Sequence, residues 1–242
     1  GKTVANETLP PFAIFWDKDV RLAKTLEAAG VKLFNSASAI ELCDDKSLTH
    51  IALMNRVPQP KTVLIPLTFP RVGYTDCTFL EKIAAYLGFP FVIKQCFGSF
   101  GAGVYLARNM DEAKAALMKT AGGAAIAQQY IASSFARDIR AYVVGDKVAA
   151  AMLRHNESGD FRANVAQGGK ADAYTLSEAQ AVLAVKTAQL LGCTFAGVDL
   201  LFGENGEMTV CEVNSNAHFA GISAATGVNI ADKIIEAVAQ RI

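Results

Sequence analysis

Two apolar segments near the C-terminal end of the chain carry one carboxylate each. Residues 195–202 contain Asp199, residues 207–214 contain Glu212, and the residues between them read Gly-Glu-Asn-Gly. An Asn-Gly pair between such segments is the strongest short-range signal for a β-hairpin. A two-residue turn at Asn205-Gly206 sets Asp199 directly opposite Glu212. A four-residue loop would keep both on one face, and only a three-residue loop without a bulge would separate them.

Asn214 lies two residues beyond Glu212 and therefore faces the same side of the strand. Two carboxylates that face one another repel, and the apolar neighbours of both limit screening by solvent. Magnesium prefers oxygen ligands in twos and threes, with positions left for phosphate and water. The spacing therefore predicts a metal site at Asp199, Glu212 and Asn214. The alternative is that both carboxylates are merely hydrogen-bonded or exposed.

Three glycines, Gly98, Gly101 and Gly103, lie in a loop that follows Lys94 and joins two expected strands. Glycine permits positive φ and lets backbone N–H groups approach a ligand closely, while Lys94 would place an ammonium beside the same ligand. The lysine precedes the glycines and no Gly-Lys-Ser/Thr follows, so the segment is not a P-loop. It is either a phosphate-binding loop or a flexible connector.

Each of the other polar candidates can be interpreted either as an ordinary surface or structural residue or as part of a functional site. Lys46 follows Asp44-Asp45 on an early helix and would ordinarily be a surface lysine. Arg137, Asp138 and Arg140 open a strand, either as a solvated cluster or as part of a site.

The expected loop after residue 155 contains a second group of polar side chains. Arg162 and Asn164 stand two residues apart in it, and Arg154 comes just before it. His218 follows Asn214 in Ser-Asn-Ala-His-Phe and is either structural or catalytic.

The apolar periodicity and the capping signals that must position these residues predict an α+β chain. Helices are expected over 20–29, 36–53, 79–87, 111–119, 175–191 and 230–242. Strands are expected over 12–16, 31–34, 62–65, 91–94, 104–107, 125–130, 138–144, 147–152, 195–202 and 207–214. Gly145-Asp146 predicts a tight hairpin between two of these strands.

The composition argues against several function classes. The 242 residues include 23 basic and 23 acidic ones, so no basic excess points to nucleic acid or an anionic membrane. No apolar run approaches the roughly 20 residues of a membrane helix, and the N-terminus lacks a signal-peptide pattern. The five cysteines are odd in number and too scattered for a metal knuckle. They indicate buried free thiols and a cytoplasmic protein.

Taken together, these segments resemble the ATP-grasp superfamily and, within it, the RimK-like amino-acid ligases related to glutathione synthetase. The resemblance runs from about Ser36 to the C-terminus, and the order and spacing of its motifs make it specific. The motifs are Asp45-Lys46, Val92-Ile-Lys94 with the glycine loop, Gln128-Gln-Tyr-Ile131, Arg137-Asp-Ile-Arg140, Gly159-Asp-Phe-Arg-Ala-Asn164, Gly197-Val-Asp199 and Cys211-Glu-Val-Asn214.

The resemblance implies an ATP-grasp fold, in which two α+β subdomains at 58–127 and 128–242 enclose ATP. Residues 1–57 would form a partial N-terminal α/β segment with a linking helix. The resemblance implies two Mg²⁺ ions, or Mn²⁺ instead, at Asp199, Glu212 and Asn214. The implied nucleotide-binding residues are Lys46, Lys94, Gly98, Ser99, Phe100, Gly101, Gln128, Gln129, Tyr130, Ile131, Asp138, Arg140 and Asn164.

The resemblance also implies a reaction. A carboxylate attacks the γ-phosphoryl group of ATP to give an acyl phosphate and ADP, and an amine then attacks the acyl carbon and releases phosphate. Arg162 should hold the acyl phosphate, with Arg154 as a second candidate. The expected amine is an amino acid such as glutamate, and the acid belongs to a peptide, protein or small molecule. Relatives often form dimers or tetramers, so self-association is a further expectation.

Three departures from the family pattern leave alternatives open. Gln129 replaces the usual Glu of a Gln-Glu-Tyr segment, and Ser215–Phe219 stands where relatives commonly carry a Pro-Gly turn. Only a stub of the N-terminal domain is expected, up to about Leu33. The rival interpretations are a nucleotide-binding module without ligase activity, an ATP-grasp kinase, and a ligase for a substrate other than an amino acid.

Overall fold

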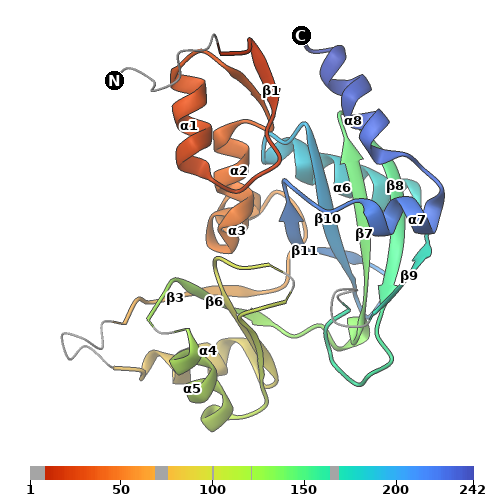
Figure 1. The fold of residues 1–242 in the computed structure, drawn as a ribbon. Coiled ribbons are helices and arrows are strands. Elements are labelled where there is room, and N and C mark those ends of the chain that lie inside the picture. The colour runs from red at the N-terminus through yellow and green to blue at the C-terminus, as the bar shows by residue number, and fades with distance from the viewer. Residues whose placement is uncertain (1–8, 69–75, 100, 121, 164–168) are drawn as a thin grey trace.

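The computed structural model describes residues 9–68, 76–99, 101–120, 122–163 and 169–242. They form three β-sheets with helices packed on them, so the predicted α+β class is confirmed (Figure 1). No helix in these ranges is long and apolar enough to cross a membrane.

The N-terminal unit is a parallel pair of strands covered by helices. Its elements are β1 (Phe12–Ile14), α1 (Val20–Ala28), β2 (Lys32–Phe34), α2 (Ala37–Asp44) and α3 (Lys46–Leu53). The Ser36 hydroxyl caps α2 by accepting the N–H of Ala39.

The single helix expected over 36–53 is wrong, because the chain breaks at Asp45. The Asp45 carboxylate accepts the backbone N–H groups of Ser47 and Leu48 and so starts a second helix. Lys46 therefore opens α3, and its own N–H donates to the carbonyl of Cys96 at 3.1 Å. The break ties Lys46 to the segment that leads into the glycine loop.

A four-stranded antiparallel sheet in the order β3-β6-β4-β5 carries the glycine loop. Its strands are β3 (Thr62–Ile65), β4 (Phe91–Gln95), β5 (Val104–Ala107) and β6 (Ala125–Gln129), and its helices are α4 (Phe79–Leu87) and α5 (Met110–Lys119). Leu80, Phe91 and Ile93 are fully buried in the core between the sheet and these helices. This core holds β4 in place, and β4 in turn positions Lys94 and the glycine loop that follows it.

A five-stranded antiparallel sheet in the order β11-β10-β7-β8-β9 is the largest of the three sheets. Its strands are β7 (Arg137–Val144), β8 (Lys147–His155), β9 (Lys170–Ala173), β10 (Phe195–Phe202) and β11 (Met208–Asn214). A short 3₁₀ turn, Ala132–Ser134, leads into β7. Val144 pairs with Lys147, which confirms the tight hairpin.

Helices cover the large sheet on both faces. One apolar cluster packs the sheet against α6 (Glu178–Leu190), whose first turn is capped by Ser177. A second cluster packs it against α7 (Ala220–Thr226) and α8 (Ile230–Ala239). The sequence did not predict β9 or α7, because the former is only four residues long and its only apolar residues are alanines, and the latter has no side-chain cap.

The hairpin of β10 and β11 has a longer loop than predicted. Phe202 pairs with Met208, and Gly203 donates its N–H to the Glu207 carbonyl at 2.7 Å. The predicted two-residue turn at Asn205-Gly206 is therefore wrong.

A β-bulge restores the predicted pairing further along the hairpin. The register shifts by one residue between Asp199 and Leu200, so that Cys211 has no partner of its own on β10. As a result Asp199 pairs with Glu212, and Asn214 lies two residues further along the same strand. The two carboxylates share a face, as the sequence predicted.

The buried side chain of Asn35 joins the N-terminal unit to the large sheet. Its amide nitrogen donates to the carbonyls of Phe195 and Ser215, at 2.8 and 2.9 Å. Its oxygen accepts the backbone N–H groups of Thr194 and Phe195, at 2.6 and 3.2 Å. These four bonds fix the end of β2 beside the start of β10 and the end of β11.

Candidate active site

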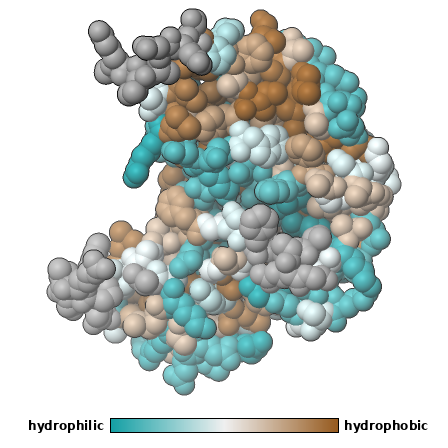
Figure 2. Space-filling model, in the orientation of Figure 1, coloured by the Kyte–Doolittle hydropathy of each residue, from teal (hydrophilic) through white to brown (hydrophobic). Residues whose placement is uncertain are grey.

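One cavity of about 500 Å³ collects the polar residues that the sequence singled out. The residues predicted to bind nucleotide that line it are Lys46, Lys94, Gly98, Ser99, Gly101, Gln128, Gln129, Tyr130, Ile131, Asp138 and Arg140. Asp199, Glu212, Asn214, Arg154, Arg162 and His218 line it as well. Phe100 and Asn164, also predicted, lie outside the described residues. Figure 2 shows hydrophilic residues gathered across the middle of this face, between the upper and lower lobes.

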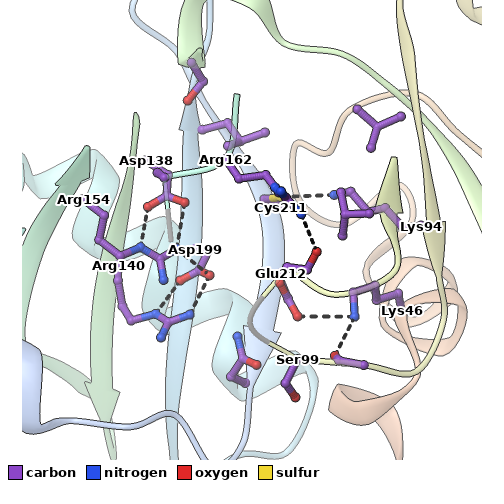
Figure 3. Close-up of a pocket in the computed structure, with 18 of the residues that line it drawn as sticks. Lys46, Lys94, Ser99, Asp138, Arg140, Arg154, Arg162, Asp199, Cys211 and Glu212 are labelled. Carbon is purple, nitrogen blue, oxygen red and sulfur yellow. Dashed lines mark hydrogen bonds and ion pairs between the residues drawn. The ribbon is translucent and has the colours of Figure 1, made fainter. Parts of the chain in front are cut away.

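Asp199 is 4% exposed and lies between two arginines (Figure 3). Arg140 donates to both of its carboxylate oxygens at 2.7 Å, and Arg154 lies 2.8 Å from one of them. Burial alone would raise the pKa of Asp199, but the two guanidinium groups outweigh burial and hold the pKa below its usual value. The compensating positive charge that the facing carboxylates require is therefore supplied by arginine.

Asp138 shares Arg154 with Asp199. Arg154 is 4% exposed and donates to the two oxygens of Asp138 at 2.6 and 2.7 Å. Burial raises the pKa of Asp138 in spite of the attraction of Arg154. Two aspartates and two arginines thus form one buried network with balanced formal charge. The predicted contact of Arg154 with an acyl phosphate stays a prediction, because its guanidinium here faces the two aspartates.

Glu212 stands on the open side of this network, next to Lys46. Its carboxylate lies 3.5 Å from the Lys46 ammonium, and its side chain is 31% exposed. The described residues contain no cluster of three or more His, Cys, Asp or Glu side chains that could hold a metal by themselves. Asp199, Glu212 and Asn214 bring two carboxylates and an amide together, a donor set that suits Mg²⁺ when phosphate oxygens and water complete its coordination. Asp199 would then share its oxygens between the metal and the two arginines that bond to them here.

Lys94 lies on the opposite wall of the cavity. Its ammonium donates to the side-chain oxygen of Gln128 at 2.6 Å and lies 3.5 Å from the Cys211 sulfur. Burial raises the pKa of the Cys211 thiol, although Lys94 opposes the shift. Gln128 therefore orients the lysine, a role that the sequence did not suggest.

The segment after Gln128 forms one end of the cavity. The side-chain oxygen of Gln129 accepts the backbone N–H of Lys61 at 3.3 Å, as a carboxylate could also do. The Tyr130 ring packs edge-on against Phe161, with 6.3 Å between ring centroids.

The glycine loop is held from both sides. Lys46 donates to the Gly98 carbonyl at 3.2 Å, and Arg162 donates to the Gly101 carbonyl at 2.9 Å. Arg162 is also paired with Asp160, at 2.6 Å. Gly103 has φ +70°, and a Cβ there would clash with the Gln95 side chain. The loop therefore requires glycine at Gly103, and its carbonyls are held by two cations.

The cavity-lining residues that sequence reasoning missed include the polar side chains of Lys18 and Asn216. Lys18 precedes α1 and bonds to Asp44 and Ser99, at 2.8 and 3.2 Å. Nothing in its local sequence distinguishes it from a surface lysine, since its partners are 26 and 81 residues away.

Comparisons of the sequence with protein families and with individual proteins agree with one another. Residues 43–238 match the RimK-like ATP-grasp domain. The chain is 34% identical over 248 residues to a Mycoplasma pneumoniae protein that is called uncharacterized, with 98% of this chain and 84% of that protein covered. It is 37% identical over 219 residues to a probable alpha-L-glutamate ligase of Rhodopirellula baltica, with 89% and 52% covered, so it spans about half of that relative.

A solved structure has a similar fold. It is the ATP-grasp ligase PsnB complexed with minimal precursor, Mg and ADP, which has a TM-score of 0.66 and 20% identity. The match covers 91% of this chain and 67% of that one. This likeness confirms the predicted ATP-grasp fold.

Proposed function

The chain belongs to the family of RimK-like ATP-grasp domains and is an ATP-dependent ligase of the carboxylate-amine type; from this premise we propose that it adds an amino acid such as glutamate to a carboxylate of a peptide, protein or small molecule. The name of the Rhodopirellula baltica relative supports glutamate as the amine.

One observation carries the proposal: a single cavity has cations on the glycine-loop wall and two facing carboxylates on the hairpin wall. Lys46, Lys94 and Arg162 provide the cations, and each is within hydrogen-bonding distance of a neutral oxygen of the chain, while Lys46 and Arg162 also have a carboxylate partner in Glu212 and Asp160. A triphosphate offers all three cations charged oxygens in place of the neutral ones, which strengthens those contacts.

We assign the adenine end of ATP to the segment Gln128–Ile131 and the phosphates to Lys46, Lys94 and the glycine loop. Asp199, Glu212 and Asn214 would hold Mg²⁺, which supplies neutralisation of charge on phosphate oxygens. Asp138, which lines the same cavity, would face the ribose.

Phosphoryl transfer needs alignment and charge neutralisation more than covalent chemistry from the protein. Arg162 would hold the reacting carboxylate and the transferred phosphoryl group with its two-pronged guanidinium. Its present partners, Asp160 and the Gly101 carbonyl, already aim it at the glycine loop. The loop and Arg162 together would exclude water from the acyl phosphate.

Hydroxylamine trapping tests this proposal before the amine is identified. Wild-type protein, Mg²⁺-ATP and a panel of carboxylic acids, including glutamyl peptides, are incubated with hydroxylamine, which converts an acyl phosphate to a stable hydroxamate. The acid that gives a hydroxamate is then offered each amino acid, and the amide is identified by mass. We expect glutamate to give the highest rate, and Lys94→Met to abolish hydroxamate formation. ADP release without hydroxamate or amide for any acid would contradict the ligase proposal.

A further inference from the structure

Lys18 lies at a point where three elements of the fold meet. It precedes α1, its ammonium lies 2.8 Å from Asp44 at the end of α2, and it donates to the Ser99 hydroxyl of the glycine loop at 3.2 Å. The carboxylate of Asp17 accepts the backbone N–H groups of Lys18 and Asp19, which orders the turn that presents Lys18. The lysine therefore links the N-terminal unit directly to the glycine loop of the four-stranded sheet.

The environment of Lys18 differs from that of an ordinary surface ion pair. The side chains of Lys18 and Asp44 are 27% and 18% exposed, and Lys18 lines the cavity. Lys24 and Glu41 also join α1 to α2, at 2.7 Å, but they are 54% and 44% exposed and do not line the cavity. Since the second pair joins the same two helices, what distinguishes Lys18 is its contact with Ser99.

Lys18 also differs from the other two cations that hold the glycine loop. Lys46 and Arg162 contact loop carbonyls, and the proposed function assigns both to the phosphates. All three cations have a carboxylate partner, but Lys18 is assigned to no phosphate, it contacts a loop hydroxyl instead of a carbonyl, and its partner Asp44 lies outside the proposed metal site. The contact with Ser99 can therefore persist when Lys46 and Arg162 turn to the nucleotide.

We propose that Lys18 is a positioning residue that fastens the Ser99 end of the glycine loop to the N-terminal unit, and so keeps water from the acyl phosphate during the ligation. This inference rests on the proposed function for the nature of the intermediate. The fastening itself can be measured without any ligation.

The first measurement is hydrogen–deuterium exchange of peptides from the glycine loop, with the non-hydrolysable analogue AMPPNP and Mg²⁺ bound. Lys18→Met should speed exchange of the loop amides about five- to tenfold, the effect of losing one partly exposed hydrogen bond of ordinary strength. Lys18→Arg should restore slow exchange, because a guanidinium can reach both partners. Lys24→Met, which breaks the matched pair outside the cavity, should leave loop exchange as in wild type. Unchanged exchange in Lys18→Met would overturn the proposal.

The second measurement is the ratio of ADP released to amide formed, with the acid and amine found by trapping. Lys18→Met should raise this ratio about five- to tenfold, since water then reaches the intermediate, while its Kd for ADP stays within about twofold of wild type. Faster loop exchange with an unchanged ratio would refute the water-excluding role. A wild-type protein that forms no amide with any acid contradicts the proposed function, whereas the exchange experiment still decides the fastening. Thermal unfolding of all three variants checks that each is folded.

Discussion

Arg154→Met should lower the free energy of unfolding, because it breaks the buried network of Asp138, Arg154, Asp199 and Arg140. Arg154 makes three short contacts with carboxylate oxygens, two to Asp138 and one to Asp199. Asp199 keeps the two bonds from Arg140 in the variant, whereas Asp138 loses its guanidinium partner. Removing one partner of a buried ion pair costs about 3–5 kcal/mol. We therefore expect the free energy of unfolding to fall by about 4 kcal/mol at neutral pH.

The loss should depend on pH with a defined sign. The raised pKa of Asp138 means that its folded carboxyl holds a proton more tightly than in the unfolded chain. Its contribution to stability is therefore present at low pH and is lost as pH rises through the raised pKa. Removing Arg154 raises this pKa further, because the guanidinium lowers it. The destabilisation should thus grow as pH rises above the ordinary pKa of an aspartate, by at most about 1.4 kcal/mol per pH unit.

Urea unfolding at several pH values measures both effects. Arg137→Met is the matched control, because the Arg137 side chain is exposed, donates to the neutral Ser133 carbonyl and contacts the Phe202 ring. This variant should lose about 1 kcal/mol or less. The double variant Arg154→Met with Asp138→Leu should recover about 2 kcal/mol, since no unpaired charge is then buried at Asp138. A loss below about 1 kcal/mol in Arg154→Met, with no pH dependence, would refute the argument that this network is desolvated.

Two further predictions concern the backbone around the site. Asn35→Ala removes the four hydrogen bonds that join β2 to the large sheet, and should lower the free energy of unfolding by about 3 kcal/mol or more in urea denaturation; a loss under about 1 kcal/mol would contradict the role of this side chain. Gly103→Ala places a methyl group against the Gln95 side chain at positive φ and should weaken AMPPNP binding about tenfold by calorimetry, whereas Gly206→Ala, at φ +84° with open space around it, should bind normally. Equal affinity in both glycine variants would mean that the loop conformation does not affect nucleotide binding.

Local signals in the sequence predicted most of the elements and the face that the acidic residues share. The helices that begin after Ser36 and Ser177 and the tight turn after Val144 depend only on neighbours in sequence, and the structure has a helix or a turn at each of these expected places. Asp45 was misjudged because the same side chain can stand within a helix or start a new one, and apolar spacing does not distinguish the two.

The pairing of Asp199 with Glu212 in the hairpin was predicted correctly, but from a turn that the structure does not have. The turn count placed Asp199 opposite Glu212, but the true loop is longer and a bulge at Cys211 compensates. A bulge leaves no reliable mark on apolar alternation, so the sequence could not predict it.

Contacts between distant segments account for the rest of what the sequence did not show. Arg140 and Arg154 could be assigned to Asp199 only after three strands were placed side by side. Lys18 and Asn35 bond to residues more than 80 and about 160 positions away, and neither belongs to a motif.

The magnesium dependence of nucleotide binding tests the central claim most directly. Titration calorimetry of ADP, with and without Mg²⁺, is carried out on wild type, Glu212→Gln and Glu207→Gln. Glu212 faces Asp199, whereas Glu207 lies in the loop of the same hairpin and accepts a backbone N–H from Asn205. We predict that Mg²⁺ tightens ADP binding in wild type and in Glu207→Gln, and that Glu212→Gln loses most of this effect while still binding ADP without metal. Full magnesium-dependent tightening in Glu212→Gln would contradict the assignment of the facing carboxylates to a metal-nucleotide site.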